Sequence, residues 1–206
     1  MSSVGATAPH PAIPAAGWLK GWCQGLSQIF FQSNVFTALL ILAAFAVADW
    51  RMALLVLIGA AGNTVTGRLI GADSSSVTAG MQGFCGALVG AATFAAIGGQ
   101  WAAYPIALIG GALCAPVIWL VNALFTKTPL RIYGLPSTTA PFCIVATIIL
   151  FSTEALHVSA PTSATIDSAP LAFVRSLLTN VSEVVLINNE WSGALILLGL
   201  FVASWK

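Results

Sequence analysis

Long apolar stretches alternate with short polar breaks along most of the chain. Five stretches are candidate membrane crossings: residues 35–48, 52–70, 77–97, 101–125 and 140–156. No Asp, Glu, Lys or Arg occurs from Ser74 to Thr126, and because a spanning helix needs about 20 apolar residues, at least two crossings fit in that interval. These stretches are apolar on every face, which predicts an all-α fold, a polytopic bundle of transmembrane helices.

The first stretch, residues 35–48, is too short to cross a bilayer alone. It either gains length from the preceding "LSQIFF" or belongs to a broken helix. Membranes tolerate a broken helix only where the irregular backbone is buried in protein or faces a water-filled cavity. Both alternatives make the residues before Val35 part of the same transmembrane unit.

One segment of the chain occurs twice. "SQIFFQSNVFTALLIL" returns 155 residues later as "SEVVLINNEWSGALIL", which pairs Gln28 with Glu183 and Asn34 with Asn189. Five predicted crossings, an odd number, lie between the copies, so the second copy must enter from the opposite side of the membrane. The sequence therefore predicts an inverted repeat, with a pore or binding site near the midplane between its halves.

The repeat and the polar breaks together predict how the chain is organised. The predicted units are a flexible tail (1–19), a first transmembrane repeat (20–156), a connector (157–171) and the start of a second repeat (172–206). If the loops alternate sides, one side carries Lys20, Arg68, Lys127 and Arg131, and the other carries Arg51. The positive-inside rule then places the N-terminus in the cytoplasm, which predicts a multi-pass protein of the inner (plasma) membrane.

Composition strengthens the membrane assignment and narrows the partners. Hydrophobic residues make up 58% of the chain and charged residues 6%, against about a quarter charged in soluble domains. A net charge of +1 gives no field for nucleic acid or an acidic substrate, so we expect a neutral solute. The four cysteines have no metal-ligand spacing, and His10 and His157 lie in loops with no second ligand nearby. No catalytic or cofactor motif occurs, so we expect neither an enzyme nor a cofactor.

Two polar residues at matching positions are the strongest candidates for function. A polar group at membrane depth costs about 2.5–3.5 kcal/mol if it is charged, so Gln28 and Glu183 need either a position at the membrane edge or a role. A helix cap or a snorkelling side chain is the simpler alternative for each. Their equivalence in the two copies favours two hydrogen-bonding groups that face one pathway for a polar, neutral solute.

Two further motifs have both a structural and a functional interpretation. "GMQGFCGALVG" contains the GxxxG pair Gly86 and Gly90, which indicates close helix packing, while Phe84 and Leu88 share one helix face and are candidates to line a pathway. "LPSTTAPF" places threonines before an apolar helix, where Thr139 either caps the helix or offers its hydroxyl to a solute.

In their order and spacing, "GLSQIFFQSNVFTALLIL", "GMQGFCGALVG" and "LPSTTAPF" resemble the urea transporter family of bacteria and animals. The resemblance covers residues 25–156 as one complete family repeat and the chain from Leu177 onward as the opening of a second. It implies a passive, channel-like urea pathway in a homotrimer embedded in the lipid bilayer. Each protomer would have two inverted halves of five crossings plus a tilted re-entrant helix.

The resemblance also implies the roles of eight residues. Gln28 and Glu183 would mark the two ends of the filter, and Thr139 would offer its hydroxyl beside a ladder of oxygen acceptors. The walls of the slot would be aromatic at Phe31 and Phe84 and apolar at Leu88, Ile29 and Val184. Urea is flat and rich in N–H donors, so a narrow slot lined with acceptors on its edge replaces the water that urea loses.

The chain departs from the family pattern in places. Cys85 stands where the family usually has Asn, Ser137 and Thr138 replace Val-Phe, and the second copy has no aromatic residue at Leu186. No second copy of the other two motifs follows before Lys206, so we expect an incomplete slot. A truncated or frameshifted product, a fragment of a longer reading frame, and a half-size protein that pairs with an oppositely inserted copy are the alternatives.

The expected function is therefore passive transport of urea, incomplete as encoded. A membrane subunit that does not conduct, whose polar residues only cap and pack helices, is one alternative. A channel for another small neutral amide is the other.

Overall fold

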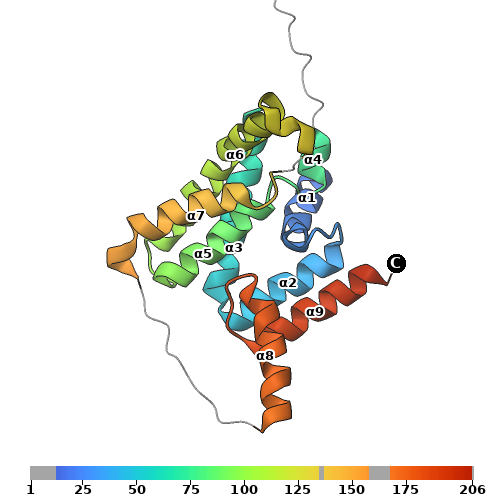
Figure 1. The fold of residues 1–206 in the computed structure, drawn as a ribbon, viewed down its shortest axis with the longest axis vertical. Coiled ribbons are helices and arrows are strands. Elements are labelled where there is room, and N and C mark those ends of the chain that lie inside the picture. The colour runs from blue at the N-terminus through green and yellow to red at the C-terminus, as the bar shows by residue number, and fades with distance from the viewer. Residues whose placement is uncertain (1–12, 135–136, 158–167, 206) are drawn as a thin grey trace, which may run out of the picture.

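The computed structural model describes residues 13–134, 137–157 and 168–205, and within them the chain is an all-α membrane bundle without strands (Figure 1). Residues 1–12 of the predicted tail, residues 158–167 of the connector, and Leu135 and Pro136 lie outside this part. The helices are α1 (Ala15–Ser27), η1 (Gln28–Phe30), α2 (Val35–Ala48), α3 (Trp50–Leu69), α4 (Ser74–Thr78), α5 (Phe84–Ile97), α6 (Ala103–Lys127), η2 (Pro129–Tyr133), α7 (Ala140–Ser152), η3 (Glu154–Leu156), α8 (Ala169–Glu183) and α9 (Glu190–Ser204).

Two of the helices in the described part are long and apolar enough to cross a membrane, α3 and α6. A third span is added if α1 with η1 and α2 count as one, although the two parts meet at an angle of 75°. This bend agrees with the broken-helix alternative for residues 35–48. The remaining apolar helices α5, α7 and α9 have only 14, 13 and 15 residues, so the count of five crossings stays a prediction.

Two predicted crossings are shorter than the sequence pattern indicated. The stretch 77–97 is divided, because α4 ends at Thr78 and α5 begins only at Phe84. Between them Gly80 has φ +78°, and a β-carbon there would stand 2.5 Å from the backbone of Gln24 in α1. The turn therefore packs directly on α1, and a continuous helix is excluded. The second shortened crossing is the stretch 140–156, in which α7 already ends at Ser152.

Glycines bring α3, α5 and α6 into backbone contact at the centre of the bundle. A β-carbon on Gly86 or on Gly111 would stand 2.2 Å from the carbonyl oxygen of Gly59, and one on Gly90 would stand 2.2 Å from that of Leu55. This confirms the packing interpretation of the Gly86–Gly90 pair, since small residues let membrane helices approach closely. The junction fixes α5, the helix that carries two predicted site residues.

The two copies of the repeated segment have the same local structure. Ser27 and Ser182 each donate a side-chain hydrogen bond of 2.9 Å to the carbonyl three residues before. Asn34 and Asn189 then cap α2 and α9 with their side-chain oxygens. Between serine and asparagine, the chain reverses through residues in the left-handed region at equivalent positions, Phe31 with φ 56° and Leu186 with φ 63°. The motif thus specifies a helix, a break and a capped second helix.

Reciprocal hydrogen bonds join the two copies. The Thr37 hydroxyl donates to the Gly199 carbonyl at 2.8 Å, and the Ser192 hydroxyl donates to the Ala44 carbonyl at 2.7 Å. Thr37 and Ser192 are equivalent in the repeat, and so are Ala44 and Gly199. Helices α2 and α9 consequently lie side by side and antiparallel, whereas α8 extends away from the rest (Figure 1).

Thr37→Val and Ser192→Ala are expected to destabilise the α2–α9 pair to the same extent. Each removes one buried interhelical hydrogen bond, a loss of about 0.6 kcal/mol in membrane bundles, and the double variant should lose roughly the sum. Unfolding in mixed micelles by increasing SDS measures both. Thr126→Val is the control, because that hydroxyl bonds within its own helix to Asn122. A loss confined to one of the two sites would contradict the equivalence.

Candidate functional site

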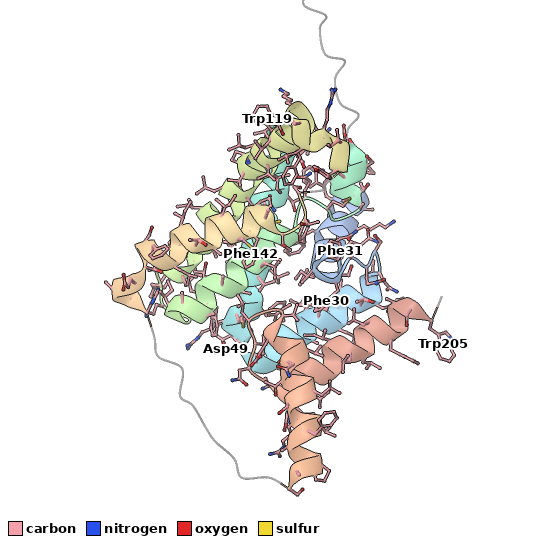
Figure 2. All side chains as sticks on the ribbon, in the orientation of Figure 1. Phe30, Phe31, Asp49, Trp119, Phe142 and Trp205 are labelled. Atoms are coloured by element: carbon pink, nitrogen blue, oxygen red, sulfur yellow. The ribbon has the colours of Figure 1, made fainter. Side chains whose placement is uncertain are left out.

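Three of the predicted site residues line one cavity at the start of α5. We call it the first cavity. It has a volume of about 320 Å³, and its walls come from η1, α4, α5, α6 and the turn before α7. Figure 2 shows Phe31 at the break that follows α1, and Phe142 in the first turn of α7. The lining residues are Gln28, Phe31, Ser76, Met81, Gln82, Phe84, Ile118, Asn122, Ser137 and Thr138.

The amide of Gln28 is oriented by two hydrogen bonds. Its Nε2 donates to Ser33 Oγ at 2.8 Å and to the Ala79 carbonyl at 2.9 Å. Both amide hydrogens are thereby used, and within the described residues no donor bonds to Oε1. The side chain that caps the start of α2 is Asn34, and Gln28 instead bonds to the turn that follows α4. Its Oε1 remains an acceptor, and Gln28 is one of the residues that line the cavity.

The two aromatic residues of this cavity are held in different ways. Phe84 is buried in the first turn of α5. Phe31 is 66% exposed and has φ 56°, which is rare for a bulky residue because the left-handed region crowds its β-carbon. Such strain of about 1–3 kcal/mol persists where the surroundings enforce it, often at ligand sites. The backbone turn thus holds an aromatic ring out of the core.

The threonine beside this cavity is Thr138 rather than Thr139. Thr139 is the N-cap residue before α7 but makes no side-chain cap hydrogen bond, so its capping interpretation was wrong. Thr138 lines the cavity in the left-handed region, with φ 37°, and its carbonyl accepts a hydrogen bond from Cys85 Sγ at 3.5 Å. Cys85 and Thr138, which both differ from the family pattern, are therefore joined by this hydrogen bond.

A second cavity lies toward the other end of α5. It has a volume of about 230 Å³ and is lined by Ala92, Ala95, Ala96, Leu150, His157 and Leu186. Phe84, Leu88, Ala92 and Ala96 are spaced four residues apart, so they share one face of α5. Leu88 is buried on this face between the two cavities. We name the row of these four residues the α5 face; Phe84 lines the first cavity, and Ala92 and Ala96 line the second.

The remaining predicted residues lie apart from the first cavity. Ile29 is buried in the core, whereas its equivalent Val184 is 59% exposed. Glu183 lines a third, polar cavity of about 360 Å³ on α8, together with Ala172, Arg175, Ser176, Thr179, Asn180 and Asn188. The structure therefore does not bring Glu183 together with Gln28. From the second copy, Leu186 lines the second cavity beside α5.

Sequence reasoning missed several residues of these cavities. Asn122 is a polar residue in an apolar helix, and that signal alone identifies it as a candidate. Ile118 and Met81 carry no such signal, because apolar residues at helical spacing are mostly core. His157 is exposed, as expected for a solvated loop residue. The sequence did not indicate that its ring also bonds the Leu150 carbonyl at 3.0 Å and lines the second cavity.

The chemistry available at the two cavities is hydrogen bonding and apolar contact. No cluster of three His, Cys, Asp or Glu side chains suited to a metal ion occurs in the described part. Neither of these two cavities carries an Asp, Glu, Lys or Arg side chain in its lining. An ion that entered either cavity would lose its hydration water and find no opposite charge in the lining. A neutral polar solute needs only hydrogen bonds to replace the water that it loses.

Comparison with known proteins identifies the family. A search of the curated proteins found no match. The sequence model of one protein family, described as "Urea transporter", matches residues 19–206, nearly the whole chain. The chain belongs to the urea transporter family.

Proposed function

We propose that the chain provides a passive pathway for urea across the plasma membrane, as a homotrimer in the lipid bilayer. Membership of the family supports urea as the solute. The observation that carries the proposal is the α5 face, on which Phe84, Leu88 and Ala92 follow one another from the first cavity to the second. One face of one helix then guides the solute.

Each end of this pathway has a chemical role in the proposal. The Gln28 oxygen accepts a hydrogen bond from a urea N–H group and replaces lost water. The rings of Phe31 and Phe84 offer flat apolar surfaces, which favour a planar solute by shape. Leu88 keeps the middle of the pathway narrow and dry. Weak successive contacts of this kind let the solute leave as well as enter.

We further propose that the repeated segments belong to an inverted repeat and that α1 with η1 is a re-entrant helix. The antiparallel packing of α2 against α9, through equivalent hydrogen bonds, supports the first point. The 75° bend between α1–η1 and α2 supports the second. In this arrangement Glu183 marks the end of the pathway that is equivalent to Gln28, and Ile29 and Val184 are equivalent wall positions. Thr139 contributes its hydroxyl beside Thr138.

Gln28→Leu tests the proposal. It removes the acceptor, and an unmet N–H group of the solute costs about 1.4 kcal/mol or more, so urea permeability of proteoliposomes should fall about tenfold. Ser33→Ala is the matched control, since it removes one bond that orients Gln28 but leaves its oxygen. If Gln28 only packs the turn, the leucine variant at normal yield will conduct urea as well as the control does, and the proposal fails.

A further inference from the structure

His157 stands where the second cavity has no other polar side chain. The residues that share the cavity with it are Ala92, Ala95, Ala96, Leu150 and Leu186, all of them apolar. The side chains that a solute with N–H groups meets there are apolar apart from the imidazole. The first cavity, by contrast, offers the Gln28 amide and several hydroxyl groups.

The hydrogen bonds of the ring determine which nitrogen carries the proton. His157 Nε2 lies 3.0 Å from the Leu150 carbonyl oxygen, which can only accept. It also lies 3.5 Å from Thr153 Oγ1, whose own hydrogen is donated to the Ile149 carbonyl at 2.8 Å. Both neighbours of Nε2 are therefore acceptors, so Nε2 carries the hydrogen. In the neutral imidazole, Nδ1 is then an acceptor.

We propose that His157 Nδ1 is a second acceptor for urea, at the end of the α5 face opposite Gln28. The inference rests on the proposed function, because it assigns a contact on the same pathway. It gives the two cavities one design: a ring or amide is fixed by donating to backbone carbonyls, and its remaining acceptor faces the solute. In the first cavity Gln28 donates to the Ala79 carbonyl, and in the second His157 donates to that of Leu150.

The apolar neighbours of His157 suit the same solute. Leu186 is equivalent to Phe31 in the repeat and, like it, is held in the left-handed region beside a cavity on the α5 face. Leucine provides apolar contact without an aromatic ring. A flat molecule at this end is consequently positioned mainly by its hydrogen bond to the imidazole.

Substitutions of the exposed His157 separate the acceptor from the ring. His157→Phe keeps a ring without an acceptor and should lower urea permeability of proteoliposomes several-fold. His157→Gln restores an acceptor and should retain permeability within about twofold. Glu154→Gln, on the preceding turn and outside the cavity lining, is the control and should match the wild type. Equal permeability of the phenylalanine variant and the wild type would overturn the inference while leaving the proposed function intact.

A second measurement does not depend on transport. The chain has two histidines, so in a His10→Ala background His157 carries the one imidazole that diethyl pyrocarbonate can label, and mass spectrometry follows the labelling rate at that residue. Urea is expected to slow this labelling in a concentration-dependent way, while glycerol at the same concentration is not. A rate unaffected by urea overturns the contact at His157. Protection in a protein that conducts no urea would overturn the pathway but not the binding site.

Discussion

Gly111→Ala is expected to prevent the bundle from folding. The added methyl group would stand 2.2 Å from the carbonyl oxygen of Gly59 and within 2.9 Å of two more backbone atoms of that residue. Overpacking by one methyl group costs about 1–3 kcal/mol where side chains can shift, and backbone can shift far less. The solubilised variant should aggregate on size-exclusion chromatography, at a temperature where the wild type elutes as one peak.

Gly199→Ala provides the matched control for this prediction. Gly199 is also a buried glycine within a helix, but a β-carbon there would come no nearer than 3.4 Å to any neighbour, which is ordinary contact. Alanine favours a helix over glycine by about 1 kcal/mol, so this variant should be as stable as the wild type or more so. Equal stability of the two variants would contradict the account of the α3–α5–α6 junction.

Phe31→Ala is expected to lower urea permeability three- to tenfold while the protein stays folded. The ring is largely exposed, so its loss removes little packing, yet an aromatic face contributes about 0.5–1.5 kcal/mol to a flat partner. Proteoliposomes under a urea gradient measure the change. Selectivity for urea over glycerol, which is not flat, should fall with it.

Phe36→Ala tests whether the effect belongs to the cavity. Phe36 lies five residues further along, is 68% exposed and is not among the residues that line the first cavity. The variant should conduct urea at the wild-type rate. If both phenylalanine variants lose permeability equally, the first cavity is not where the aromatic surface acts.

Local patterns predicted the helices whose ends depend on their own residues. The predicted stretch 35–48 and α2 have the same bounds, because Asn34 caps the start and Asp49 begins a break. The sequence pattern predicted a start for α5 that is too early. The true start depends on the turn at Gly80, which packs on α1, a helix far away in the sequence. Apolar content continued through that turn and concealed it.

The candidate site was predicted in part for the same reason. Gln28, Phe31 and Phe84 lie within motifs, and their meeting in one cavity follows from where the motifs fold. The choice between Thr138 and Thr139 depends on a backbone reversal that no spacing rule gives. His157 reaches the second cavity only because α7 ends early and turns back, which is a tertiary property.

Stopped-flow light scattering on proteoliposomes tests the central claim most directly. When vesicles containing the chain meet a urea gradient, they should shrink and then swell again faster than protein-free vesicles, as urea enters along the α5 face. Under a sodium chloride gradient they should behave like protein-free vesicles. Reswelling in urea at the protein-free rate would contradict the account.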